Sequence, residues 1–122
     1  GGKLIVSPNS NPEVIRETKR LGLRSVPGVM TPTECFAALD AGADALKLFN
    51  AGTVGPGTLK AYRAVLPKDL PVYAVGGVTV DNAREWIKAG ANGYGLGANV
   101  YKPGMTIDEI KQRARAFTAL WA

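Results

Sequence analysis

Lys47 is the residue whose type and position could do covalent chemistry. It lies in the apolar run Ala45-Leu-Lys-Leu-Phe49, which has the length and composition of a strand. Because side chains alternate along a strand, Leu46 and Leu48 face one side and Lys47 the other. If the leucines pack against helices, Lys47 points inward, where desolvation lowers the pKa of its amine and leaves a nucleophile that forms Schiff bases with ketones. The alternative is a strand-end lysine that reaches water or pairs with a carboxylate.

Two glycine-rich segments could bind an anion. Val75-Gly-Gly-Val-Thr79 connects an apolar run to a helical pattern, so the amides of Gly76 and Gly77 can approach an anion beside the positive end of the helix. In Gly93-Tyr-Gly-Leu-Gly-Ala98, alternation puts three glycines on one strand face, which leaves space for a ligand. Each segment alone also fits a tight turn. Together they predict a phosphate site in which Gly97 stands beside the paired glycines.

Composition excludes several kinds of chemistry. Histidine is absent and Cys35 is the single cysteine, which removes the usual zinc ligand, the Ser-His and Cys-His nucleophile pairs, and an internal disulfide. Any chemistry of this chain therefore needs other groups. The net charge of +5 fits an anionic ligand, but the basic residues are spread over polar helix faces, so no nucleic-acid partner is inferred.

Length and hydropathy predict one domain. The chain has 122 residues, ordinary globular composition and no apolar run long enough for a membrane span. The amino terminus lacks the apolar segment of a signal peptide. We therefore expect a cytoplasmic protein without a membrane partner.

The elements that must position these residues follow a repeat. Short apolar runs alternate with segments of helical period, and the runs centre near Ile5, Val26, Lys47, Ala74 and Leu96. Strands joined by helices run parallel. The pattern predicts an α/β fold of parallel (β/α) repeats of the TIM-barrel type, with about five of the eight units. Five units cannot close that barrel, so a partial barrel with two free strand edges is expected.

Capping patterns mark the helices. The spacing of a capping box occurs in three pairs, Ser10 with Glu13, Thr31 with Glu34, and Thr106 with Glu109. Glycine follows three helical segments, at Gly22, Gly42 and Gly90.

Four segments carry a family resemblance: Leu4-Ile-Val-Ser-Pro-Asn9, Ala45-Leu-Lys-Leu-Phe49, Tyr73-Ala-Val-Gly-Gly-Val-Thr79 and Gly95-Leu-Gly. In these the chain resembles the class I aldolases that cleave 2-keto-3-deoxy-6-phosphosugar acids, over all 122 residues. The resemblance implies that residues 1–122 are the C-terminal part of a single (β/α)8 barrel domain, without an internal boundary. It also implies a homotrimer of complete barrels, which needs the N-terminal strands of the family.

The resemblance also implies roles for particular residues. Lys47 matches the lysine that forms the pyruvate Schiff base, and neither a metal nor a cofactor is implied. The substrate- and phosphate-binding positions are matched by Phe49, Val75, Gly76, Gly77, Gly97 and Ala98. The family cleaves its phosphorylated keto-deoxy sugar acid to pyruvate and glyceraldehyde 3-phosphate. Val75 favours a galactonate substrate, because gluconate-type relatives usually have threonine there.

Three departures from the family matter. Asn50 replaces a usual proline, which predicts a looser turn after the lysine strand. Ala98 replaces a frequent serine, which leaves the phosphate to backbone amides and predicts weaker binding. The catalytic glutamate and a substrate-binding arginine of the family lie on its first strands, so we expect this chain alone to form a Schiff base at best.

Other functions stay open at this point. The substrate could be the gluconate epimer. The chain could also be a non-catalytic phosphate-binding partial barrel, with an incidental lysine. A third hypothesis is another phosphate-binding barrel enzyme, of the thiamine-phosphate or tryptophan-pathway type, which needs no inward lysine at position 47.

Overall fold

The computed structural model describes residues 1–121 and has an α/β architecture. Its elements in chain order are β1 (Leu4–Val6), α1 (Pro12–Arg20), β2 (Arg24–Val26), β3 (Gly28–Val29), α2 (Pro32–Asp40), β4 (Leu46–Phe49), α3 (Ala51–Val54), α4 (Pro56–Arg63), β5 (Val72–Val75), α5 (Val80–Lys88), β6 (Gly93–Gly95), α6 (Ile107–Thr118) and the short 3₁₀ helix η1 (Ala119–Trp121). Within these residues no helix is long and apolar enough to cross a membrane.

The strands run parallel, as the repeat predicts. β1 pairs with β2, and β3, β4, β5 and β6 form a second sheet in that order. The predicted strand around Val26 is divided at Pro27, which has no N–H to donate to a neighbouring strand. The last strand ends at Gly95, so its predicted centre at Leu96 is wrong. The chain leaves the sheet there and turns, with the amides of Val100 and Tyr101 both donating to the carbonyl oxygen of Gly97.

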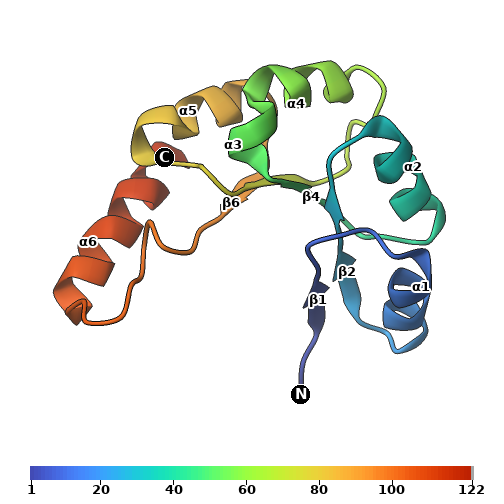
Figure 1. Ribbon diagram of the computed structural model, residues 1–122, viewed down its shortest axis with the longest axis horizontal. Coiled ribbons are helices and arrows are strands. Elements are labelled where there is room, and N and C mark those ends of the chain that lie inside the picture. The colour runs from blue at the N-terminus through green and yellow to red at the C-terminus, as the bar shows by residue number, and fades with distance from the viewer. Residues whose placement is uncertain (122) are drawn as a thin grey trace.

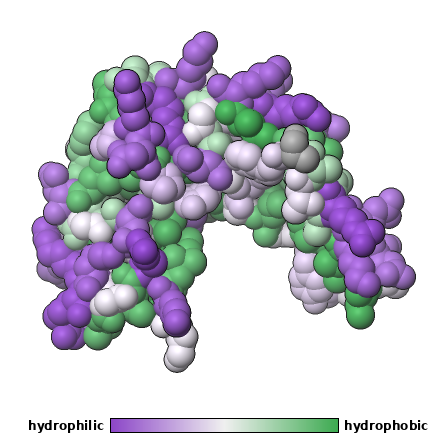
Figure 2. Space-filling model, turned by 180° about the vertical axis from the view of Figure 1, so that it is seen from behind, coloured by the Kyte–Doolittle hydropathy of each residue, from purple (hydrophilic) through white to green (hydrophobic). Residues whose placement is uncertain are grey.

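The elements form an arch (Figure 1). The helices follow one another along its outer side, from α1 in blue to α6 in red, and the strands line its inner side. Seen from behind, the same arch has two lobes separated by a wide hollow (Figure 2). Five strand-helix units give this open shape, which agrees with the predicted partial barrel.

The core lies between the strands and the outer helices. Leu46 and Leu48 of β4 are buried there, as are Val72 and Ala74 of β5, and Trp86 of α5 packs against them. Alternate positions on the two central strands therefore contact the helices. The remaining positions of these strands face the inner side of the arch.

Two of the three predicted capping boxes are present, and the third is wrong. Thr31 and Thr106 cap α2 and α6 in capping boxes with Glu34 and Glu109. Ser10 is not the cap of α1. Asn11 is, and its side chain accepts hydrogen bonds from the amides of Glu13 and Val14. Because Pro12 takes the first helical position, Glu13 comes one residue too early for a capping box.

Glycine ends the helices where predicted. Gly22, Gly42 and Gly90 have φ values of 71°, 100° and 98°, a left-handed conformation that only glycine adopts at little cost. Each one turns the chain back from the outer helix layer toward the next strand.

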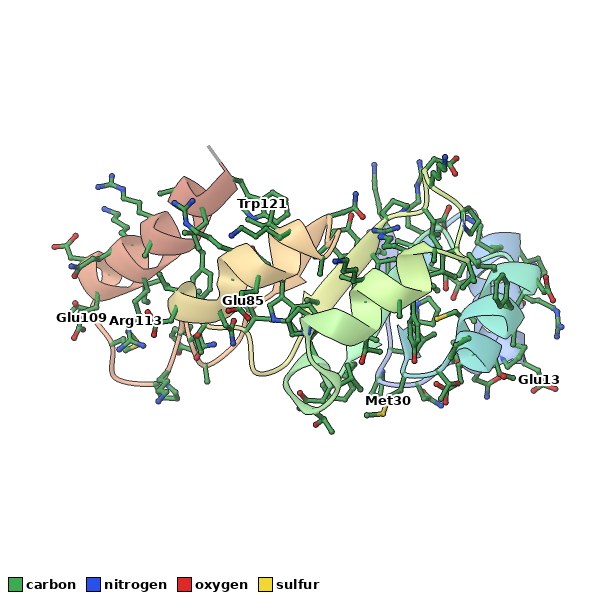
Figure 3. The ribbon with its side chains drawn as sticks, turned by 90° about the horizontal axis from the view of Figure 1, so that it is seen from above. Glu13, Met30, Glu85, Glu109, Arg113 and Trp121 are labelled. Carbon is green, nitrogen blue, oxygen red and sulfur yellow. The ribbon has the colours of Figure 1, made fainter. Side chains whose placement is uncertain are left out.

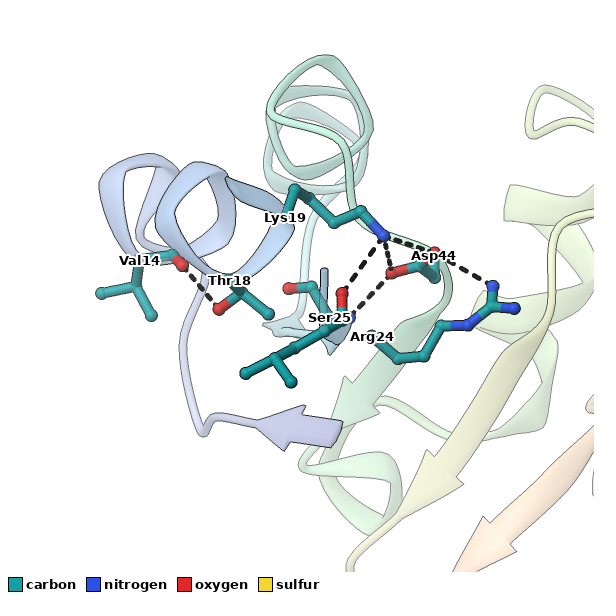
Figure 4. Close-up of polar contacts among 7 residues, drawn as sticks. Val14, Thr18, Lys19, Arg24, Ser25 and Asp44 are labelled. Atoms are coloured by element: carbon teal, nitrogen blue, oxygen red, sulfur yellow. Dashed lines mark hydrogen bonds and ion pairs between the residues drawn. The ribbon is translucent and has the colours of Figure 1, made fainter. Parts of the chain in front are cut away.

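An ionic cluster joins the first units of the arch (Figure 4). Lys19 of α1 contacts both carboxylate oxygens of Asp44 at 2.7 Å, and Arg24 of β2 contacts one of them at 3.2 Å. The amide of Ser25 donates to the same carboxylate at 2.8 Å. Asp44 lies just before β4, so this carboxylate ties α1 and β2 to the strand that carries Lys47.

Candidate active site

Lys47 lies on the inner face of β4. Leu46 and Leu48 are buried against the helices, so alternation turns Lys47 to the opposite side, as predicted. The strand register places it between Gly28 of β3 and Tyr73 of β5. Despite the open arch, only 9% of Lys47 is exposed.

Burial lowers the pKa of the Lys47 amine below its ordinary value of 10.5. No charged group or hydrogen-bond partner among residues 1–121 contributes to that shift. The nitrogen lies 4.8 Å from the centre of the Phe49 ring, a contact that stabilises the ammonium by only about 0.5–1 kcal/mol at a partly exposed ring. Lys47 is therefore more often neutral than an ordinary lysine.

One pocket collects the predicted binding residues. Phe49, Val75, Gly76, Gly77, Gly97 and Ala98 all line it, together with Val78, Thr79, Gly95 and Asn99, and its volume is about 360 Å³. The carboxyl ends of β4, β5 and β6 thus meet at one site. Lys47 is not part of this lining, and Phe49 is the residue that both touches its amine and lines the pocket.

The pocket offers unpaired backbone donors. The amides of Gly77, Gly97 and Ala98 donate to no carbonyl oxygen within residues 1–121. Thr79 caps α5 directly behind them, so the positive end of that helix faces the same space. Free amides beside a helix N-terminus are the features that bind phosphate in other folds.

The glycine face of β6 is less hollow than predicted. A Cβ at Gly93 would lie 2.9 Å from the ring of Tyr73, and a Cβ at Gly95 would lie 2.5 Å from a methyl group of Val75. Side chains of β5 therefore occupy the space that these two glycines leave. Of these three glycines, only Gly97 has open space beside it, because a Cβ there would meet no atom within 4 Å.

Two residues at this site, Asn99 and Asn82, are not predicted from the sequence. Asn99 lines the pocket, and its side-chain amide donates to the carbonyl oxygen of Val78, which joins the loop after β6 to the loop after β5. Asn82 closes a capping box with Thr79. The threonine-to-asparagine spacing could have indicated this box, whereas nothing local marks Asn99.

The acidic residues lie outside the described strands. Glu13, Glu85 and Glu109 are on α1, α5 and α6, three separate helices (Figure 3), and each is exposed. The carboxylate of Glu34 accepts hydrogen bonds from the amides of Met30 and Thr31. No described strand carries an acidic residue, so these strands bring no carboxyl group to Lys47.

A buried amine thus lies near a glycine-lined pocket at the carboxyl ends of parallel strands, the end of the strands where barrel enzymes have their sites. Comparison with known proteins gives the family: the family model described as KDPG and KHG aldolase matches residues 1–114. The chain belongs to this aldolase family.

The similar proteins include one curated protein and two solved structures. The 2-dehydro-3-deoxy-6-phosphogalactonate aldolase of Escherichia coli is 49% identical over 117 residues, which cover 96% of this chain and 57% of that protein. A structure described as native KDPGal has a TM-score of 0.93 and 47% identity, covering 98% of this chain and 58% of its own. A cage designed by fusing symmetric oligomeric domains matches with a TM-score of 0.92 and 47% identity, covering 98% of this chain and 44% of its own.

The chain spans little more than half the length of the curated relative. The activity of the whole protein is therefore a matter for proposal.

Proposed function

We propose that this chain carries the Schiff-base lysine and the phosphate site of a class I aldolase. The substrate is 2-dehydro-3-deoxy-6-phosphogalactonate, and the products are pyruvate and glyceraldehyde 3-phosphate. The observation that carries the proposal is the inward position of Lys47: its amine is buried, its pKa is lowered, and it touches the ring of Phe49 at the rim of the glycine pocket.

Lys47 supplies the covalent chemistry. Its neutral amine attacks the C2 ketone, and the carbinolamine loses water to give an iminium. The C4 hydroxyl then loses its proton and the C3–C4 bond breaks, so the electron pair passes to the iminium nitrogen and glyceraldehyde 3-phosphate leaves. A proton adds to C3 of the resulting enamine, and water hydrolyses the iminium to pyruvate and free Lys47.

The glycine pocket holds the other end of the substrate. The unpaired amides of Gly77, Gly97 and Ala98 donate to phosphate oxygens, and the N-terminus of α5 adds its positive potential. This arrangement needs no charged side chain in the pocket lining, and the lining has none.

Val75 bears on the sugar epimer. It lines the pocket at the end of β5, next to Gly76, and its apolar side chain offers no hydroxyl to a substrate hydroxyl group. Together with the similarity to the galactonate enzyme, this favours the galactonate substrate. The gluconate epimer is the second candidate.

The complete protein supplies what these residues lack. We propose that residues 1–122 are the C-terminal part of one (β/α)8 barrel domain, whose preceding strands bring the acid–base group needed for turnover, and that the complete barrel forms a cytoplasmic homotrimer. The exposed residues Leu4 and Val6 of β1 and the free edge of that strand support a neighbouring strand. The similarity to a chain in a cage of fused symmetric oligomeric domains supports an oligomer.

Reductive trapping tests the proposal. The purified chain is incubated with pyruvate and borohydride, and the modified residue is mapped by mass spectrometry. We expect one adduct, on Lys47, and none in Lys47→Ala. Lys60→Ala, which removes an exposed lysine of α4, serves as the matched control and should be trapped like the unaltered chain.

Two results would favour the alternatives. If the chain gives no adduct at Lys47, it is better described as a non-catalytic phosphate-binding module. If Lys47→Ala in the complete protein retains activity, a phosphate-binding barrel enzyme without an inward lysine is indicated.

A further inference from the structure

Asn50 stands where β4 ends and α3 begins. It is the N-cap of α3, and its side-chain oxygen accepts a hydrogen bond of 3.0 Å from the amide of Gly52. The sequence predicts a loosened turn at this position. The structure instead closes the turn through this side chain, because asparagine can accept the amide that the start of a helix leaves unpaired.

The same side chain covers the turn after β5. A Cβ at Gly76 would lie 2.8 Å from both Cγ and Oδ1 of Asn50, so the carboxamide occupies the space above that glycine. The amide of Gly52 also donates to the carbonyl oxygen of Gly76 at 2.9 Å. At Gly77 a Cβ would lie 2.7 Å from the Cα of Gly52. The two loops therefore interlock.

This contact joins the two halves of the proposed site. β4 carries Lys47, and the turn after β5 carries Gly77, which lines the pocket and whose amide donates to no carbonyl oxygen within residues 1–121. Asn50 is itself outside the pocket lining, so it acts on a ligand only through the turn. A ligand with a ketone at one end and a phosphate at the other fits only while the distance between strand and turn stays fixed.

We propose that Asn50 is a positioning residue that holds the Gly76–Gly77 turn at a set distance from Lys47. It thereby gives the site its preference for molecules that contain both the ketone and the phosphate. This inference rests on the proposed function, since it needs Lys47 to be the reactive amine.

The test compares two trapping rates on the full chain. The first is the rate of borohydride trapping with 2-dehydro-3-deoxy-6-phosphogalactonate, and the second is the rate with pyruvate, which has no phosphate. We expect Asn50→Ala to reduce the ratio of the first rate to the second about fivefold, the effect of losing one ordinary contact. Asn11→Ala is the matched control. It removes the same kind of cap from α1 and should leave the ratio at its original value.

A second variant separates positioning from capping. In Asn50→Ser the hydroxyl can still accept the amide at the helix start, but it is too short to cover Gly76. We expect the thermal unfolding midpoint of Asn50→Ser to stay near that of the unaltered chain while the ratio of trapping rates falls.

The results separate this inference from the proposed function. Absence of any adduct on the unaltered chain would defeat both. A normal adduct on Lys47 with an unchanged ratio in Asn50→Ala and Asn50→Ser would defeat the inference alone. A ratio that falls equally in Asn11→Ala would assign the effect to general stability and also overturn the inference.

Discussion

At the scale of single residues, the site combines a buried amine with backbone amides that donate to no carbonyl oxygen within residues 1–121. Burial is the cause of the lowered pKa of Lys47. The amides of Gly97 and Ala98 stay free because the turn after β6 is closed through the carbonyl oxygen of Gly97, which accepts from Val100 and Tyr101. The buried amine and the free amides both lower the stability of the fold, and a bound anionic ketone would offset this by contacting them.

The lowered pKa of Lys47 predicts how trapping depends on pH. Only the neutral amine attacks pyruvate, so the rate rises as the pH approaches the pKa of the amine. Because burial lowers that pKa, we expect this rise at a lower pH than for a lysine with the ordinary pKa of 10.5. Trapping rates measured over a pH series check this. A profile that follows an ordinary lysine would show that Lys47 is solvated in solution.

Ala98 predicts a gain from substitution. Ala98→Ser adds a hydroxyl beside the free amides, and one additional neutral hydrogen bond tightens binding of inorganic phosphate about fivefold. Titration followed by phosphorus NMR measures the dissociation constant. Ala119→Ser, on the exposed surface after α6, is the control. Equal affinities in all three proteins would contradict a phosphate site at Ala98.

The site residues that follow a local pattern are predictable from the sequence. The alternation in β4 was enough to place Lys47 opposite Leu46 and Leu48. Asn50 and Asn99 were not reached in this way, because their contacts are to Gly76 and Val78 on another strand-helix unit. No spacing along the chain encodes a contact of that kind.

At the scale of elements, the glycines set how closely the loops approach. Gly77 has a φ of 70°, and a Cβ there would collide with the backbone of Gly52. The turn after β5 therefore tolerates no side chain at this position. The paired glycines are needed for packing between loops as well as for the approach of an anion.

Gly77→Ala should destabilise the fold. The left-handed backbone and the contact with Gly52 together cost about 1–3 kcal/mol. Gly57→Ala is the matched control, because Gly57 lies in α4 and a Cβ there would meet no atom within 4 Å. At this helical position alanine should raise the free energy of unfolding by up to about 1 kcal/mol. Urea denaturation measures both. Equal unfolding free energies for Gly77→Ala and the unaltered chain would refute the interlocked turn.

The elements themselves were largely predictable. The parallel strands and the ends of three helices follow from apolar runs and glycines. The cap of α1 is Asn11, one residue after the Ser10 that the capping-box spacing predicts, because Pro12 takes the first helical position. The division of a strand at Pro27 and the short helix α3 were not expected, since both depend on how the chain packs on its neighbours.

At the scale of the whole molecule, the arch has one apolar edge. Leu4, Ile5 and Val6 of β1 are all exposed, and the strand pairs only with β2 within residues 1–121. The ionic cluster around Asp44 holds this edge to the rest of the arch. The stability of the chain should therefore depend on that carboxylate.

Acid should weaken the cluster. Burial opposes ionisation of Asp44, but hydrogen bonds from Lys19, the amide of Ser25 and Arg24, together with the charge of Lys19, outweigh it and hold the pKa below the ordinary 3.8. A lowered pKa means that the stabilisation is complete above the unfolded-state value and is lost as pH falls through the folded-state value.

Asp44→Asn tests this dependence. At pH 7 we expect the free energy of unfolding to fall by about 1.5–3 kcal/mol, the contribution of a charged hydrogen bond. The difference from the unaltered chain should shrink as the pH falls below the ordinary 3.8 of an aspartate. Urea denaturation at pH 7 and at a pH below 3.8 measures the two unfolding free energies. A difference between the two proteins that stays the same at both pH values would contradict the role of the Asp44 charge.

A crystal structure of the chain after trapping with pyruvate, in the presence of inorganic phosphate, tests the central claim most directly. The account predicts a reduced pyruvyl group on Lys47 Nζ and a phosphate bound by the amides of Gly77, Gly97 and Ala98, both on the inner side of the arch. A phosphate bound elsewhere, or a pyruvyl group on another lysine with Lys47 unmodified, would contradict it.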